Sequence, residues 1–275
     1  MQDWFAAPWV QYGLAPFLAA LLVAELCNRL RISGFALIAG IATTATLGAR
    51  GLPSLTPVTA PERIVFVALV AALVGLVLDL APKLRRPVAV IVALCAGALV
   101  IWISPPAVTR ANWLAVLAPA GLGVLYAVWT AGTLTLLADS PERAGAAGVG
   151  LGAAVGVCAL LAGVAQLAAI AFAAAAACAA YLLIQAISNA RLSCGMLFVL
   201  PLSAACALIP PVAVLHAGLS WYLVPALALI PATSLIPFSE RLSTSARVVL
   251  ALALAAATGA AVSALVWYVM GAPAK

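Results

Sequence analysis

The chain contains a stretch of forty-seven residues without a charged side chain, between Arg143 and Arg191. A single helix of that length, rising about 1.5 Å per residue, would be about 70 Å long, whereas the hydrocarbon core of a bilayer is about 30 Å thick. We therefore expect two apolar helices joined by a tight turn, and the residues from Gly163 to Gln166 suit that turn. A water-soluble domain has no comparable use for so long an uncharged segment, so lipid is the expected solvent of this chain.

The composition of the whole chain indicates the same solvent. Of its 275 residues, 67% are apolar and 7% are charged, whereas soluble domains are about 45–50% apolar and about 25% charged. So few charges cannot cover a water-facing surface, which excludes a cytosolic enzyme, a nucleic-acid-binding protein and a disordered chain. Ten spanning helices of about 20 residues would use nearly the whole chain. We predict an all-α, polytopic integral membrane bundle in which residues 1–275 form one transmembrane domain.

Charged residues and prolines divide the sequence into ten apolar runs, which we interpret as membrane spans. The predicted spans are 10–27, 33–49, 64–81, 88–104, 114–136, 146–164, 168–187, 195–215, 222–238 and 248–270. The eighth and ninth runs are separated where His216, Gly218 and Ser220 interrupt the apolar sequence.

The distribution of basic residues orients these ten spans. With the N-terminus on the outer side, the inner loops contain Arg29, Arg31, Lys83, Arg85, Arg86, Arg143, Arg191, Arg241 and Arg247. The outer side then contains Arg50, Arg63, Arg110 and Lys275. Because cytoplasmic loops carry the excess of Lys and Arg, both termini are predicted on the outer, periplasmic side. The net charge of +6 therefore reflects topology and gives no reason to expect a nucleic-acid partner.

The tryptophans indicate the same orientation. Under this topology, six of the seven fall near the outer surface: Trp4, Trp9, Trp102, Trp113, Trp221 and Trp267. Indole rings favour the membrane–water interface, so this agreement supports ten spans. Trp129 falls elsewhere. The short loops and the abundance of Ala and Gly favour a bacterial inner membrane as the location.

No ionisable residue is expected in the middle of a span. Three acidic residues instead precede a basic residue by four positions at inner helix ends: Glu25 with Arg29, Asp79 with Lys83, and Asp139 with Arg143. Residues at this spacing share one helix face, so we interpret these as interfacial ion pairs. Glu25 lies deepest, and we assign the Glu25–Arg29 pair as an inner-gate contact. Glu142 is expected in a loop.

The side chains that membrane enzymes require do not occur in the necessary arrangements. The six cysteines lie singly, with no CxxC spacing and no nearby His, so we interpret them as small buried apolar residues. The sequence contains no acid-rich metal motif, no paired histidines and no serine–base pair. We therefore expect no catalytic residue, no metal and no cofactor. The absence of a titratable group in mid-membrane also argues against proton coupling through a carboxylate.

Uncharged polar groups mark the fifth span as the first candidate substrate cavity. Tyr126, Trp129, Thr130 and Thr133 stand at i, i+3, i+4 and i+7, so they share one helix face. Their rings would contact an apolar solute and their hydroxyls would orient it. The alternative is helix packing, with each hydroxyl bonded to its own backbone.

The eighth and ninth spans form the second candidate region. Prolines interrupt both spans, and we expect kinks at Pro210, Pro211, Pro225 and Pro231. A carbonyl freed by proline needs a partner in hydrocarbon, which is why broken helices accompany transport sites. Ser203, Thr233 and Ser234 lie among these prolines and complete the list of cavity candidates.

The sixth span carries small residues at the spacing of a helix-packing face. Gly148, Gly152 and Gly156 recur every four residues and would let another helix approach closely. We expect this contact inside the bundle, with a homodimer contact as the alternative.

Three functions remain open for such a chain. The first is an inner-membrane permease or exporter that moves an uncharged, amphipathic or lipid-like small solute through a cavity between the fifth span and the kinked eighth and ninth spans. The second is a non-catalytic subunit or assembly factor, whose glycine-rich span docks a partner membrane protein. The third is an enzyme that modifies lipid, for which Glu25 and His216 are the titratable groups. The expected partners are thus the lipid bilayer and a small solute or a membrane protein.

Overall fold

The computed structural model of the chain describes residues 7–30, 35–49, 59–81, 85–103, 113–188, 194–239 and 241–271. Every regular element in these ranges is helical. Among the described residues, seven helices are long and apolar enough to cross a membrane: Val10–Arg29, Ala60–Leu80, Ala118–Leu136, Pro141–Leu161, Ala165–Ser188, Gly195–Ala217 and Thr244–Met270. The prediction of an all-α, multi-pass membrane bundle is therefore confirmed for the described part of the chain.

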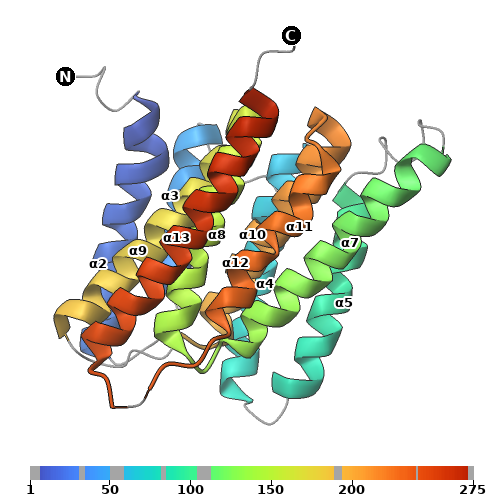
Figure 1. Cartoon of the computed structure of the whole chain (residues 1–275). Helices are drawn as coiled ribbons and strands as arrows, with labels where there is room; N and C mark the ends of the chain where they lie inside the picture. The colour runs from blue at the N-terminus through green and yellow to red at the C-terminus, as the bar shows by residue number, and fades with distance from the viewer. Residues whose placement is uncertain are drawn as a thin grey trace.

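The long helices alternate in direction along the chain (Figure 1). In chain order they are η1 (Val10–Leu14), α2 (Ala15–Leu30), α3 (Phe35–Ala49), α4 (Ala60–Leu80), α5 (Arg85–Ile103), α7 (Trp113–Leu136), α8 (Pro141–Leu161), α9 (Ala165–Ser188), α10 (Gly195–Ala217), η3 (Trp221–Leu223), α11 (Val224–Leu227), α12 (Leu229–Ser234) and α13 (Thr244–Gly271). The turn within the long uncharged stretch falls at 162–164, where Gly163 has a φ of 79°.

Three apolar helical segments are shorter than the seven candidate spans. They are Phe35–Thr44, Val90–Ile103 and Trp221–Ser234, and they overlap the second, fourth and ninth spans expected from the sequence. The last of them is divided into η3, α11 and α12. At about 1.5 Å per residue its helical part is about 21 Å long, which is shorter than the hydrocarbon core. The expected ninth span is therefore a broken helix.

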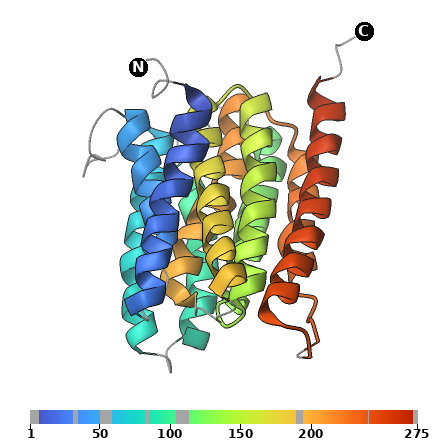
Figure 2. The ribbon, with the colours of Figure 1, turned by 90° about the vertical axis from the view of Figure 1, so that its left-hand side faces the viewer.

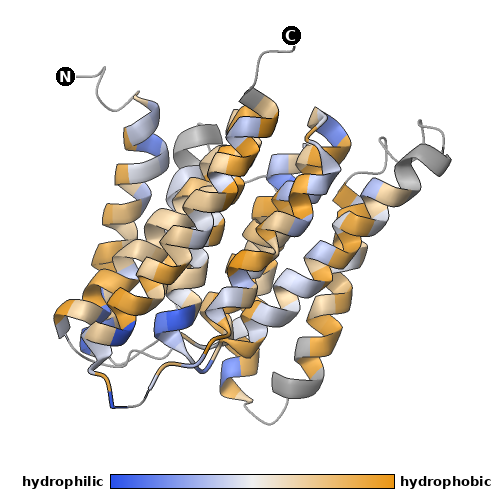
Figure 3. Cartoon of the chain, in the orientation of Figure 1, coloured by the Kyte–Doolittle hydropathy of each residue, from blue (hydrophilic) through white to orange (hydrophobic). Residues whose placement is uncertain are grey.

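Three helices form the centre of the bundle and the others surround them. In the apolar window of α10, 94% of the residues are buried, whereas the windows of α2, α4, α7 and α13 are at most 44% buried. Figure 2 shows α8 and α9 between the outer helices in a second view. Large apolar side chains such as Leu22 of α2 and Leu73 of α4 are exposed, and Figure 3 shows such residues along the outer helices. A surface of this kind is suited to lipid.

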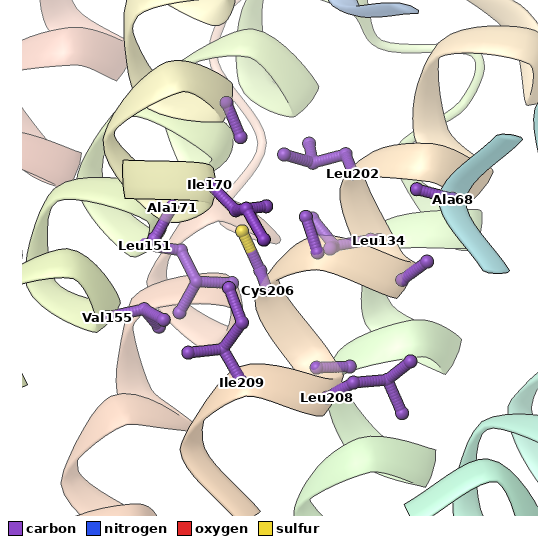
Figure 4. Close-up of a cluster of buried hydrophobic side chains, with 14 of the residues drawn as sticks. Ala68, Leu134, Leu151, Val155, Ile170, Ala171, Leu202, Cys206, Leu208 and Ile209 are labelled. Carbon is purple, nitrogen blue, oxygen red and sulfur yellow. The ribbon is translucent and has the colours of Figure 1, made fainter. Parts of the chain in front are cut away.

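The apolar core is centred on α10. In Figure 4, Cys206, Leu208 and Ile209 of α10 lie among side chains from four other helices. These neighbours are Ala68 of α4, Leu134 of α7, Leu151 and Val155 of α8, and Ile170 and Ala171 of α9. Small residues on these helices allow backbones to approach closely, which replaces the hydrophobic effect as a source of helix association in lipid.

The glycines of α8 lie at contacts inside the bundle. A Cβ atom added at Gly152 would stand 2.9 Å from the Ala171 carbonyl oxygen of α9, and one added at Gly156 would stand 2.6 Å from the Phe172 ring. Gly148 faces Cys178 of α9 in the same way. This face of α8 is therefore occupied by α9, and it is not available to a second copy of the chain.

The two ends of the bundle differ in their side chains. We call the end at which η1 begins and α13 ends the terminal end (Figure 1). The opposite end is the arginine end, where α2 ends and α8 and α13 begin, with Arg29, Arg143, Arg241 and Arg247. Trp102, Trp221 and Trp267 belong to the terminal end by their places in α5, η3 and α13. Trp4, Arg31, Arg50, Lys83, Arg110, Arg191 and Lys275 lie outside the described residues.

Arg63 is the described arginine at the terminal end. It donates from Nη1 to the carbonyl oxygens of Trp102 (3.1 Å) and Ile103 (3.3 Å), which are the last residues of α5. Its guanidinium also lies over the Trp102 ring, 5.3 Å from the ring centroid. A cation at the carboxyl end of a helix satisfies free carbonyls and favours the helix dipole, so Arg63 joins α4 to α5.

Asp79, expected to pair with Lys83, binds the start of α10. Its two carboxylate oxygens accept the backbone N–H groups of Met196 (2.8 Å) and Leu197 (3.0 Å). Gly75, one turn earlier in α4, lies so close that a Cβ atom there would stand 2.5 Å from the Met196 carbonyl oxygen. Lys83 lies outside the described residues. Asp79 therefore satisfies N–H groups that no α-helix can satisfy by itself.

A buried ion pair joins α8 to α13 at the arginine end. Glu142 lies in the first turn of α8, and its carboxylate is 3.1 Å from Nη1 of Arg247 in α13. Both side chains are 9% exposed. The expectation that Glu142 belongs to a loop is wrong, because α8 begins at Pro141, five residues before the predicted span. Beside this pair, Gln185 of α9 donates from Nε2 to the Tyr181 hydroxyl at 3.1 Å.

We expect removal of one partner to destabilise the bundle strongly. Glu142→Gln should lower the free energy of unfolding by about 3–5 kcal/mol, because a buried Arg247 would lose its counter-charge. The double variant Glu142→Leu/Arg247→Leu should recover most of that loss, since no buried charge remains. Denaturation in mixed micelles measures these differences.

The exposed Glu25–Arg29 pair provides a matched control. Its atoms are 2.8 Å apart, but the side chains are 41% and 74% exposed. Glu25→Gln should therefore change stability by less than about 1 kcal/mol. Equal losses for Glu142→Gln and Glu25→Gln would contradict the assignment of the buried pair.

Candidate functional site

The residues of α7 that the sequence grouped on one face make contacts with two different neighbouring segments in the structure. Tyr126 points to α10, is 4% exposed, and donates its hydroxyl to the Cys206 carbonyl oxygen at 3.2 Å. The residue four positions after Cys206 is Pro210, which has no N–H to donate to that carbonyl. Tyr126 therefore satisfies a carbonyl that proline has left without its helical partner, as a dry environment requires.

Trp129 donates a side-chain hydrogen bond to the backbone of the broken helix formed by η3, α11 and α12. Its Nε1–H donates to the Ala228 carbonyl oxygen at 3.1 Å, at the junction of α11 and α12. Pro225 of α11 and Pro231 of α12 lie on either side of this junction. Trp129 as a whole residue stays 46% exposed. One helix, α7, thus donates to both proline-rich segments.

The predicted hydroxyl groups bond mainly to their own helices. Thr133 donates to the Trp129 carbonyl oxygen at 2.8 Å, and Ser203 donates to Val199 at 2.8 Å. Thr233 and Ser234 both donate to the Ile230 carbonyl oxygen. Thr130 is fully buried. Such backbone bonds use the hydroxyl hydrogen and leave only oxygen lone pairs for a ligand.

The prolines of α10 do not end that helix. It runs from Gly195 to Ala217 through Pro201, Pro210 and Pro211. A Cβ atom added at Gly123 of α7 would stand 3.0 Å from Cβ of Pro211, so α7 lies closely against this part of α10. The space expected between the fifth and eighth spans is filled here by helix packing.

A groove of about 740 Å³ lies between α5 and α7. Its lining consists of Val90, Ala93 and Leu94 of α5, six residues of α7, two residues after α7, and one of α10. From α7 they are Val128, Trp129, Gly132, Thr133, Thr135 and Leu136. Ala138 and Asp139 follow α7, and Met196 belongs to α10. The groove contains two of the predicted cavity residues, Trp129 and Thr133. Tyr126, Thr130, Ser203, Thr233 and Ser234 are not in its lining.

The groove is mostly apolar, with the hydroxyl groups of Thr133 and Thr135 in its lining and a charged side chain at one end. Asp139 is the charged side chain among its described lining residues, and it is exposed in the turn between α7 and α8 at the arginine end. The place of Asp139 in the groove lining could have been inferred from the sequence, because Gly132, Leu136 and Asp139 stand at i, i+4 and i+7. The sequence did not indicate that Val90, Ala93 and Leu94 of α5 line a groove, because apolar residues of this kind also face lipid.

The predicted gate pair is remote from this groove. Glu25 and Arg29 lie near the end of α2, across the bundle from α5 and α7 (Figure 1). His216 lies in the last turn of α10, at the terminal end, so it and Glu25 belong to opposite ends. Within the described ranges, no group of three His, Cys, Asp or Glu side chains is placed to hold a metal ion.

We expect the Tyr126 hydrogen bond to depend on Pro210. Tyr126→Phe should lower the free energy of unfolding by about 1 kcal/mol, because a buried carbonyl loses its donor. In a Pro210→Ala background the alanine N–H can bond to the Cys206 carbonyl, so the same substitution should then have almost no effect.

Unfolding titrations of the four proteins measure this coupling. Tyr268→Phe serves as the control, since the Tyr268 side chain is 78% exposed near the end of α13. A loss for Tyr126→Phe that is equal in both backgrounds would show that Tyr126 does not act through the carbonyl freed by proline.

Comparisons with protein families and with curated proteins supply no function for this chain. No protein-family model matches it, and no curated protein has a significantly similar sequence. The functional inference therefore rests on the groove: its position between α5 and α7, its apolar walls, and the carboxylate of Asp139 at one end.

Proposed function

We propose that this protein is a multi-pass permease or exporter that moves an amphipathic or lipid-like small solute along the groove between α5 and α7. The observation that carries the proposal is the groove itself, with about 740 Å³ of volume, apolar walls and a polar end. Sites for small molecules are about 300–1,000 Å³ in volume and are mostly apolar, with a few polar groups that fix orientation. A solute with an apolar tail and a polar head fits that description.

The position of the groove favours entry from the membrane. Several of its residues are exposed large apolar side chains, including Val90 and Leu94 of α5 and Leu136 of α7. In a bilayer these residues would contact acyl chains. A lipid-like solute could then enter sideways without crossing water, and its head would reach Asp139 at the arginine end.

We further propose ten crossings with both termini on the outer side of a bacterial inner membrane. The terminal end holds the beginning of η1 and the end of α13, as an even number of crossings requires. Arg29, Arg143, Arg241 and Arg247 lie at the other end, whereas Arg63 lies at the terminal end, and this excess supports a cytoplasmic arginine end by the positive-inside rule. The short segments Phe35–Thr44, Val90–Ile103 and Trp221–Ser234 supply the remaining three crossings.

The two other functions have less support. Docking of a partner through the glycine face of α8 would require that face to be free, and α9 covers it. Lipid modification by Glu25 and His216 would require them to meet, and they lie at opposite ends.

Filling the groove should stop transport without unfolding the protein. Gly132 lines the groove, and a Cβ atom there would have only the Ala93 Cβ nearby, at 3.9 Å. Gly132→Leu should therefore place a side chain in the groove at little packing cost. The probe is an NBD-labelled alkyl glucoside, whose movement across proteoliposome membranes is followed by dithionite quenching.

Gly121→Leu is the matched control, because Gly121 lies on the same helix with nothing within 4 Å of an added Cβ atom. The wild type and Gly121→Leu should accelerate probe movement over protein-free vesicles, whereas Gly132→Leu should not. No acceleration by the wild type, or equal loss in both variants, would overturn the proposal.

A further inference from the structure

We propose that the groove selects amphiphiles whose head is a hydrogen-bond donor with positive charge, such as a primary ammonium, and that Asp139 binds this head. The inference rests on the proposed function, since it names the substrate class of the same groove. It also changes the expectation of an uncharged solute, because that expectation treated Asp139 only as half of an interfacial ion pair.

The polar side-chain atoms that line the groove act as acceptors. Thr135 donates its hydroxyl to the Gly132 carbonyl oxygen at 2.7 Å, and Thr133 donates to Trp129 at 2.8 Å. The indole N–H of Trp129 is used by Ala228. What these groups still present is oxygen lone pairs and a ring face, and Asp139 adds a carboxylate. A head group that donates hydrogen bonds matches this set, and one that only accepts them does not.

The carboxylate of Asp139 has capacity for a ligand besides any contact within the protein. A carboxylate offers about four acceptor sites, so a neighbour on the chain does not exhaust it. Asp139 is exposed, so an ammonium group can reach it while keeping part of its hydration.

The length and polarity of the groove define the rest of the ligand. Trp129 and the end of α7 at Leu136 are about 10 Å apart at the rise of a helix, and Asp139 lies in the turn that follows. Between Trp129 and Asp139 the lining from α7 and its turn is Gly132, Thr133, Thr135, Leu136 and Ala138, with Val90 and Leu94 on α5. An alkyl tail would lie along this surface toward Trp129, with the charged head at the arginine end.

Three dodecyl probes with different heads test the inference. Dodecylammonium, dodecanol and dodecanoate each compete with the NBD-labelled alkyl glucoside for the protein in nanodiscs of zwitterionic lipid. For the wild type we expect dodecylammonium to bind about twofold to fivefold more tightly than dodecanol, because an exposed charge pair contributes about 1 kcal/mol or less, and dodecanoate to bind most weakly.

Substitutions at Asp139 separate the contribution of the head group to affinity from that of the alkyl tail. Asp139→Asn should remove the preference for dodecylammonium while leaving dodecanol binding unchanged, and Asp139→Glu should retain the preference. Glu25→Gln is the control, since it removes an exposed carboxylate on α2 remote from the groove and should leave the preference intact. The melting temperature of each variant shows whether it is folded.

The possible results distinguish this inference from the proposed function. Equal affinities for the three probes, or a preference that persists in Asp139→Asn, would overturn the role of Asp139 while the groove remains a binding site. Binding of all probes that is insensitive to Gly132→Leu, or no binding at all, would overturn the proposed function itself.

Discussion

The backbone of α10 is the constraint on which this structure depends. In its apolar window 94% of the residues are buried, so its free N–H and C=O groups can find partners only in neighbouring helices. Asp79 of α4 accepts the N–H groups at its start, and Tyr126 of α7 donates to the carbonyl that Pro210 leaves free. The close approach of Gly75 and Gly123 allows both contacts. Through α10, the positions of α4 and α7 are thereby fixed.

The position of α7 in turn creates the groove. One face of α7 is held against α10 by Tyr126, and Trp129 is tied to the junction of α11 and α12. The next face, with Gly132, Leu136 and the turn residue Asp139, points toward α5 and lines the groove. The lack of side-chain volume at Gly132 keeps this face open. A helix that serves as a structural connection on one side thus supplies the wall of the candidate site on the other.

The sequence predicted the helical membrane bundle well because length and apolarity dominate that choice. It predicted individual contacts poorly. The first turns of α8 and α13 begin before their apolar runs, which hid the pairing of Glu142 with Arg247. Nothing in the sequence indicated that Asp79 also accepts the N–H groups of Met196 and Leu197, because these residues are more than a hundred positions away. The face at 126–133 was correctly recognised as polar, yet a helical wheel cannot show that Tyr126 meets a carbonyl while Trp129 borders a groove.

The central claim is that the groove between α5 and α7 holds an amphiphile. An experimental density map of the wild type in lipid nanodiscs tests it most directly. The account predicts an elongated density that runs from Trp129 to Asp139 along Gly132, with its head at the carboxylate. Side chains of α5 and α7 in direct contact along that line, with the elongated density absent or located elsewhere in the bundle, would contradict it.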